Sequence, residues 1–372
     1  MFANTAPIVN IDLPAPIILS CVQLFSLHLC LFCIDYLLAR HEHHIPTILH
    51  GARLRVALVV IHFLMPIVFA CPNFYINGML IGAPWFIASK IVQHASNIKD
   101  NNNKASFFNH LVRSISSMTP SNTTTTTNEE RVRIRIQGLA KVARGVFKWA
   151  FMKSIIDPQI PPNYGPLLLA LPYWSLYSVW LTAVLGIKVY CLCGISDLSF
   201  GLQQFILGIS YMDMFDSPIM AHSLRDFWSR RWNLPVKNLL HEQFFATTTH
   251  QVPQKPHDAM KITLSNQRQL SASRYTSRIV RGLFIFFVSG LFHEVMLAAV
   301  VRKVTLEQIL FFMLQGVLVL LEIKLLDTTL RPDKGWIHRT WCILFNFALL
   351  AVTGRLFLAP YIRSDLITRI FG

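Results

Sequence analysis

A histidine and a glutamate lie side by side within a long apolar stretch of the chain. His293 falls near the middle of residues 282–301, Glu294 follows it, and Ser289 shares the helix face of His293. Ionisable groups at membrane depth are costly and often mark a functional site. A positioned neutral imidazole can remove a proton from a hydroxyl, since burial disfavours its charged form. The alternative is a packing histidine bonded to a neighbouring helix.

A segment rich in arginine and tryptophan precedes this stretch. Residues 223–233 contain three arginines and three aromatic residues, and they end in Asn233. Arginine binds phosphate through paired hydrogen bonds, so the arginines are candidates for holding a phosphorylated cytosolic substrate. These candidates are Arg225, Arg230 and Arg231. Trp228 and Trp232 are candidates for the same site, or alternatively for anchors at the membrane surface. Asn233 could orient a carbonyl group.

A polar stripe runs along the next apolar stretch. Gln308, Gln315 and Glu322 are spaced by seven residues, and Glu307 adjoins the first of them. This spacing predicts a helix face turned toward a water-filled tunnel or toward other helices through hydrogen bonds. The candidates for lining a tunnel are Ser289, Glu294 and Gln315.

Two histidine-containing groups lie near the N-terminus. His28 and Asp35 share a helix face seven residues apart, and for this pair a structural role is favoured. Residues 41–44 read His-Glu-His-His, which raises the alternative of a membrane di-iron oxygenase. Such enzymes need several histidine clusters, and this chain has one, so no metal site is predicted.

The composition identifies the elements that must position these residues. Of the 372 residues, 53% are hydrophobic and 14% are charged, against about 25% charged in soluble domains. Eight apolar stretches approach the length of about 20 residues that spans a membrane. These stretches are 16–38, 53–71, 74–92, 165–187, 198–212, 282–301, 305–325 and 340–360. The predicted fold class is therefore an all-α polytopic membrane protein with about eight transmembrane helices.

The net charge of +15 is explained by orientation. With both termini outside, 28 of the 34 lysines and arginines fall in cytosolic segments, as the positive-inside rule requires. No nucleic-acid partner is needed. Residues 1–372 are predicted to form a single membrane-embedded domain with a disordered cytosolic loop at 96–130. The segment 131–156 has the pattern of a helix lying on an anionic leaflet.

The two motifs together resemble a known family. Ser-Leu-Arg-Asp-Phe-Trp-x-Arg-Arg-Trp-Asn at 223–233 and Ser-Gly-Leu-Phe-His-Glu at 289–294 look like the wax synthase-like branch of the membrane-bound O-acyltransferases (MBOATs). More closely, the chain resembles the fungal secondary-metabolite acetyltransferases of that branch. The resemblance implies a helical bundle with an internal tunnel, catalytic core motifs within 213–300, His293 as general base, and a site role for Asn233.

The resemblance also implies a reaction. His293 would remove the proton of a lipophilic alcohol, and the alcohol oxygen would attack the thioester of acyl-CoA, a co-substrate rather than a bound cofactor. Asn233 would steady the developing oxyanion. Acetyl transfer from acetyl-CoA to a terpenoid or meroterpenoid hydroxyl is the expected activity, in the endoplasmic reticulum with the catalytic loop facing the cytosol. Long-chain wax-ester synthesis and a transporter are the alternatives, and the oligomeric state is left open.

Overall fold

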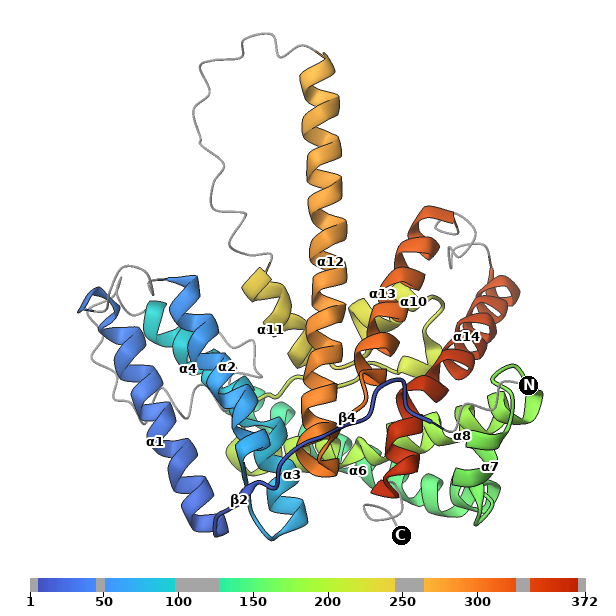
Figure 1. The fold of residues 1–372 in the computed structure, drawn as a ribbon, viewed down its shortest axis with the longest axis horizontal. Coiled ribbons are helices and arrows are strands. Elements are labelled where there is room, and N and C mark those ends of the chain that lie inside the picture. Colours follow the sequence, from blue (N-terminus) through green and yellow to red (C-terminus); the bar gives the residue numbers. More distant parts are fainter. Residues whose placement is uncertain (1–5, 45–50, 98–126, 245–263, 326–334, 367–372) are drawn as a thin grey trace.

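The computed structural model describes residues 6–44, 51–97, 127–244, 264–325 and 335–366. Helices dominate this part of the chain, and two short two-stranded sheets join them (Figure 1). The α-helices are α1 (Cys21–Arg40), α2 (Ala52–Val68), α3 (Phe74–Gly82), α4 (Pro84–Asn97), α6 (Asn128–Phe151), α7 (Tyr164–Ala170), α8 (Leu176–Leu192), α9 (Gly194–Leu207), α10 (Leu224–Asp226), α11 (Leu234–Phe244), α12 (Leu264–Val301), α13 (Glu307–Leu325) and α14 (Trp336–Arg363). The strands are β1 (Ile11–Asp12), β2 (Ile17–Ile18), β3 (Phe69–Ala70) and β4 (Lys303–Val304).

The predicted all-α polytopic membrane fold is confirmed. Five segments of the described chain are long and apolar enough to cross a membrane. They are Cys21–Arg40, Leu176–Leu207, Ile279–Val301, Glu307–Leu325 and Trp336–Arg363. The predicted stretches 165–187 and 198–212 both overlap the second of these, which comprises α8 and α9. The stretch 53–71 corresponds to α2, which has 17 residues.

Prolines explain where the apolar stretches are interrupted. The stretch 74–92 is divided into α3 and α4 because Pro84 begins a new helix, and proline disfavours a helical conformation of the residue before it. The stretch 165–187 is likewise divided, with α7 ending two residues before Pro172. The side chain of Ser175 then accepts a hydrogen bond from the Ser178 N–H and begins α8.

Two groups of helices, each with an apolar core, lie on either side of α12 (Figure 1). Near the N-terminus, α1, α2 and α4 share a buried apolar core. A second core joins α7, α8 and α14. Between these groups stands α12, whose Phe292 packs on Trp85 of α4 with ring centroids 4.7 Å apart. The antiparallel pairing of β1 with β4 attaches the N-terminal segment to the turn between α12 and α13.

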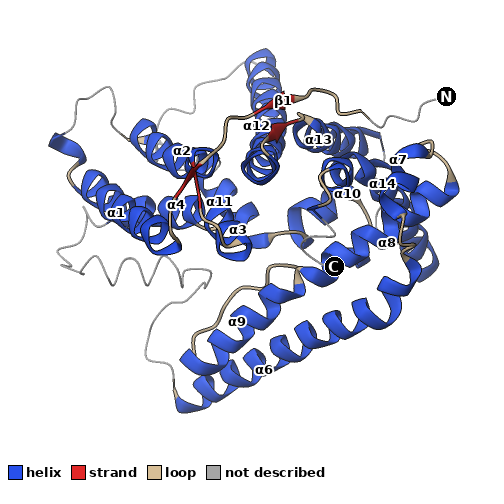
Figure 2. Ribbon diagram, turned by 60° about the horizontal axis from the view of Figure 1, so that its bottom comes forward, coloured by secondary structure: helices blue, strands red, loops and turns tan. Residues whose placement is uncertain are grey.

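The antiparallel helices α6 and α9 pack closely through glycines and are joined by ion pairs (Figure 2). A Cβ at Gly138 would lie 2.8 Å from the carbonyl oxygen of Gly201. The two backbones can therefore approach this closely only because Gly138 has no side chain. Arg144 and Lys148 donate to Asp197 at 2.6 and 2.7 Å. The segment 131–156 is therefore helical as predicted up to a π-turn at 152–156, but these two cations face α9 rather than a lipid leaflet.

The predicted loop 96–130 lies almost entirely outside the described residues. Its two ends are described: α4 ends at Asn97 and α6 begins at Asn128. Thr127 accepts a hydrogen bond from the Glu130 N–H and starts α6, with Glu129 and Glu130 in the first turn, where acidic residues favour the helix dipole.

Candidate active site

His293 lies on α12 with one ring nitrogen fixed by its own helix. Its Nδ1 is 2.8 Å from the backbone carbonyl oxygen of Ser289, one turn earlier. A carbonyl oxygen only accepts, so Nδ1 carries the proton in the neutral imidazole, and Nε2 is the unprotonated nitrogen. No other described residue forms a hydrogen bond with Nε2. Ser289 therefore acts through its backbone carbonyl, and His293 presents a free proton acceptor.

Aromatic rings surround this imidazole. The ring centroids of Phe312 and Phe357 lie 4.6 and 5.6 Å from that of His293, and Phe292 is 5.5 Å away. Phe312 belongs to α13 and Phe357 to α14, so three successive helices meet at the histidine. These rings supply apolar walls on several sides of the imidazole, which is itself partly exposed.

Close packing of α12 against α13 places Phe312 beside His293. A Cβ at Gly290 would lie 2.7 Å from the Cα of Ile309, which is too close for any side chain. Glycine at this position thus lets the two backbones approach one turn away from His293.

Glu294 faces away from His293 and holds the start of α13. Its carboxylate accepts hydrogen bonds from the N–H groups of Thr305, Leu306 and Gln308 at 2.6, 2.8 and 3.1 Å. Unpaired N–H groups at a helix N-terminus favour an anion, so Glu294 joins the end of α12 to α13. Its side chain is 3% exposed, and its oxygens are occupied by these donors. Glu294 therefore positions the helix that carries Phe312.

The polar stripe on α13 forms hydrogen bonds to other elements. Gln308 donates to the carbonyl of Phe357 at 2.8 Å, and Gln315 donates to the Thr353 hydroxyl at 2.9 Å. Glu322 accepts from the N–H groups of Leu224 and Arg225. Of the two interpretations of the stripe, these contacts support interhelical bonding.

Gln315 connects the arginine-tryptophan segment to the histidine. Trp228 Nε1 donates to Gln315 Oε1 at 3.3 Å, and the Trp228 ring lies 5.5 Å from that of Phe312. Phe312 thus lies between Trp228 and His293. Trp228 belongs to a π-helical turn, Phe227–Arg231, a conformation frequent at functional sites.

The remaining residues of the segment differ in their exposure and in their contacts. Arg231 donates to Asp226 at 2.6 Å and to the carbonyls of Asp216 and Ser217, so it stabilises the loop itself. Trp232 stacks on Phe227 with centroids 5.3 Å apart. In contrast, the side chains of Arg225 and Arg230 are exposed, and Arg230 forms no ion pair within the described part of the chain.

Asn233 follows the π-helical turn in a left-handed conformation with φ of 46°. Asparagine adopts this region more readily than most residues. Its Oδ1 is buried without a hydrogen-bond partner among the described residues. No hydrogen bond joins Asn233 to His293 in the described structure, so the structure does not bring these two predicted residues into direct contact.

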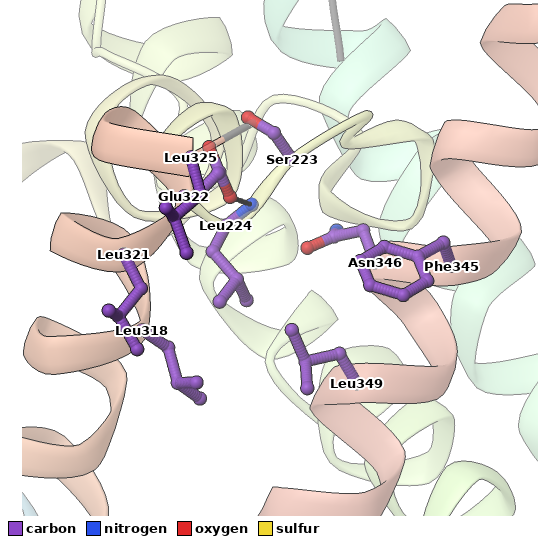
Figure 3. Close-up of a pocket in the computed structure, with 9 residues that line it drawn as sticks. All are labelled: Ser223, Leu224, Leu318, Leu321, Glu322, Leu325, Phe345, Asn346 and Leu349. Carbon is purple, nitrogen blue, oxygen red and sulfur yellow. Dashed lines mark hydrogen bonds between the residues drawn. The ribbon is translucent and has the colours of Figure 1, made fainter. Parts of the chain in front are cut away.

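Two residues of α14 belong to this region although their sequence context did not single them out. Thr353 receives the Gln315 hydrogen bond, and Asn346 donates to the carbonyl of Ala221 at 3.0 Å. Each is an isolated polar residue in an apolar stretch, and this isolation was the one feature of the sequence that could have identified it as a candidate. Asn346 also lines a cavity of about 210 Å³ between α10, α13 and α14 (Figure 3).

A second cavity, of about 340 Å³, lies beside Asn233 and is polar. It is lined by Arg144, Asp213 and the Leu234 that follows Asn233. Burial disfavours the Asp213 carboxylate, yet the hydrogen bonds and charges of Arg144 and Lys141 outweigh this effect and hold the pKa of Asp213 below its usual range. Neither cavity has His293 in its wall, so the internal tunnel stays a prediction.

No group of three or more His, Cys, Asp or Glu side chains able to hold a metal ion occurs within the described ranges. The cluster at 41–44 forms a 3-10 turn from Glu42 to His44, and the rings of His41 and His44 stack with centroids 6.2 Å apart.

Comparison with known proteins finds similarity over the part of the chain that contains these residues. Residues 211–314 match the model of the membrane bound O-acyl transferase family. This range includes the arginine-tryptophan segment, Asn233 and His293, and it ends one residue before Gln315.

The chain is also similar in sequence to proteins from Arabidopsis thaliana. The chain is 30% identical over 170 residues to a probable long-chain-alcohol O-fatty-acyltransferase 9, covering 45% of each chain. It is 35% identical over 170 residues to the probable long-chain-alcohol O-fatty-acyltransferase 1, covering 45% of this chain and 44% of that relative. The chain thus covers less than half the length of these two relatives. Together, these matches show that part of the chain is similar to the membrane bound O-acyl transferase family and to relatives named as long-chain-alcohol O-fatty-acyltransferases.

Proposed function

We propose that this protein is an acyl-CoA-dependent O-acyltransferase that transfers an acyl group to the hydroxyl of a lipophilic alcohol. The observation that carries this proposal is the hydrogen bond from His293 Nδ1 to the Ser289 carbonyl, which leaves Nε2 as a proton acceptor. The family match over residues 211–314 supports the reaction class.

The proposed reaction needs one base and an activated donor. His293 Nε2 takes the hydroxyl proton as the alcohol oxygen attacks the thioester carbonyl carbon. The tetrahedral intermediate then collapses, the C–S bond breaks, and the proton on the imidazolium passes to the departing thiolate of coenzyme A. A general base of this kind contributes about 10²–10⁴-fold to the rate. Asn233, whose Oδ1 is unpaired, is proposed to orient a reactant through its amide rather than to contact His293.

The donor is proposed to enter beside the arginine-tryptophan segment. Coenzyme A is a polyanion, and Arg225 and Arg230 present exposed cations at this segment. Arg231 and Trp232 are proposed to hold the loop in shape, since their contacts are within it. Trp228 and Gln315 are proposed to place this loop against the aromatic wall of His293.

Two donor classes are supported by different observations. The resemblance of residues 223–233 and 289–294 to acetyltransferases favours acetyl-CoA, with a terpenoid or meroterpenoid acceptor. The names of the relatives favour a fatty acyl-CoA and a long-chain alcohol, as in wax-ester synthesis. We propose acetyl transfer as the activity, with fatty acyl transfer as the second candidate, at the endoplasmic reticulum with residues 223–233 facing the cytosol.

A donor series tests the proposal. The full-length protein in lipid nanodiscs is incubated with radiolabelled acetyl-, octanoyl- or palmitoyl-CoA, together with a terpenoid alcohol or hexadecanol, and esters are identified by mass spectrometry. Preferred turnover of acetyl-CoA supports the first candidate, and preferred turnover of palmitoyl-CoA supports the second. Arg230→Gln is expected to raise KM for the donor with little change in kcat. Absence of ester with every donor would overturn the function.

A further inference from the structure

The cavity between α10, α13 and α14 has mostly apolar walls. Its volume is about 210 Å³, and it is lined by leucines that include Leu318, Leu321 and Leu349. Figure 3 shows α13 with Leu318 and Leu321 on one side and α14 with Phe345, Asn346 and Leu349 on the other. Such a space accepts an aliphatic body and offers little to a polar one.

One buried acceptor faces this apolar space without a partner. Asn346 is 3% exposed, and its Nδ2 donates to the Ala221 carbonyl at 3.0 Å. The amide cannot be reversed, because its oxygen would then face a carbonyl oxygen. Oδ1 is consequently turned toward the space between the two helices (Figure 3), where no described residue donates to it. Buried polar groups are nearly always satisfied, so this oxygen indicates a missing donor.

The other polar groups of the wall are engaged as acceptors. Glu322 Oε2 accepts from the Leu224 N–H at 2.7 Å, and Ser223 Oγ accepts from the Asp226 N–H at 3.0 Å. A ligand of this cavity therefore needs an apolar body and a hydrogen-bond donor.

We propose that this cavity is a binding site for the acceptor alcohol, whose hydroxyl donates to Asn346 Oδ1 while its chain lies against Leu318, Leu321 and Leu349. The choice of an alcohol among possible donors rests on the proposed function. Leu318 lies three residues after Gln315 on α13, and Gln315 lies three residues after Phe312, the ring beside His293. Six residues, about 9 Å of helix, separate Leu318 from Phe312, so the cavity is proposed to hold the alcohol before its hydroxyl moves along α13 to His293.

Photolabelling of the full-length protein in nanodiscs tests this site directly. The probe is a 12-carbon primary alcohol with a diazirine on its chain, and the labelled peptides are mapped by mass spectrometry. Labelling is expected within 318–325 and 345–349. Dodecanol should displace the probe about 3- to 10-fold more effectively than dodecyl methyl ether, because a neutral hydrogen bond contributes about that factor. Equal competition by the ether, or stronger competition by dodecylamine, would overturn the proposal.

Two variants test the site in different ways. Asn346→Leu removes the acceptor, and Leu318→Trp fills the cavity while leaving the bond from Asn346 to Ala221 intact. Both should reduce labelling about 3- to 10-fold. Val317→Trp is the matched control, because Val317 is 44% exposed on the same helix and lies outside the cavity wall, and it should label as the wild type does. Unchanged labelling in folded Leu318→Trp would overturn the site even if Asn346→Leu fails to fold.

Ester formation measured on the same samples separates the two proposals. Labelling that depends on Asn346 without ester formation by the wild type would retain the alcohol site and overturn the transferase function. Ester formation by the wild type, together with labelling that neither variant changes, would retain the transferase function and overturn the alcohol site.

Discussion

Two histidines in apolar helices of this protein have opposite hydrogen-bonding arrangements. His62 on α2 is 1% exposed, and its Nε2 lies 2.7 Å from Asp35 Oδ2 on α1. His293 on α12 is bonded through Nδ1 to its own helix, and no described residue bonds its Nε2. The first arrangement joins two helices, and the other ring nitrogen of His62, Nδ1, is buried without a partner among the described residues. The second fixes the ring without using the nitrogen that could accept a proton. The two histidines therefore differ in which ring nitrogen is bonded and in burial, because the unbonded nitrogen of His62 is fully buried whereas His293 is partly exposed.

The largest expected effect separates the two histidines by function. His293→Ala should lower kcat by about 10²–10⁴-fold, because it removes the proposed general base. His62→Ala should change kcat of the folded protein by less than about threefold, because His62 lies outside the proposed site. The measurement is ester formation in nanodiscs, normalised to folded protein from size-exclusion chromatography. Wild-type turnover in His293→Ala would contradict the assignment of His293 as general base and the predicted functional difference between the two histidines.

The next effect concerns stability at the other histidine. Asp35→Leu leaves the buried His62 imidazole without its partner, which should cost about 1–3 kcal/mol. The expected result is a lower thermal midpoint with an unchanged kcat for the molecules that remain folded. Adding His62→Leu to Asp35→Leu should recover part of the loss, since both polar groups are then gone. An additive loss in the double variant would show that the pair is not coupled.

A smaller effect is expected from the link between α12 and α13. Glu294→Gln replaces a carboxylate that accepts from three backbone N–H groups, so the start of α13 and the Phe312 ring should shift. We expect kcat to fall by about tenfold, or about 1.4 kcal/mol in activation free energy. The control is Glu307→Gln, which breaks the ion pair with Arg363 at the same end of α13. A loss of kcat as large in the control would assign the effect to α13 in general.

The smallest effect tests whether the backbone alone holds His293. Ser289→Ala keeps the carbonyl that accepts from Nδ1 and removes only the hydroxyl. Steady-state kinetics should show kcat and KM within about threefold of wild type, less than the roughly tenfold effect of one lost catalytic interaction. A loss of tenfold or more would give the Ser289 hydroxyl a role of its own and weaken the contrast with His62.

Sequence alone identified candidate residues for the chemistry, but it did not identify their hydrogen-bond partners. His293 and the arginine-tryptophan segment are recognisable because ionisable and aromatic residues are unusual in and beside apolar stretches. The pairing of Asp35 with His62, and not with His28, depends on how α1 and α2 pack, and no periodicity within one helix contains that information. The orientation of Glu294 toward the start of α13 likewise depends on the turn between α12 and α13.

The helix boundaries show a similar limit. Hydrophobicity identified apolar stretches, but Pro84 and Pro172 divide two of them, so stretch and helix are not equivalent. Arg144 and Lys148 of α6 were expected at a lipid surface because the sequence does not show that Asp197 lies opposite them. Asn346 and Thr353 were not singled out, since one polar residue in an apolar helix carries no spacing to interpret.

The π-helical turn at Phe227–Arg231 has a consequence for insertions and deletions. Its closing bond runs from the Trp232 N–H to the Phe227 carbonyl at 3.0 Å, so the turn contains one residue more than an α-helical turn. Deleting one residue there would restore α-helical spacing and rotate the residues after the turn by about 100° relative to Trp228. Asn233 would then leave its left-handed position beside the polar cavity. The length of this segment is therefore constrained as strictly as its composition, and related chains that keep the site should keep the residue count between Trp228 and Asn233.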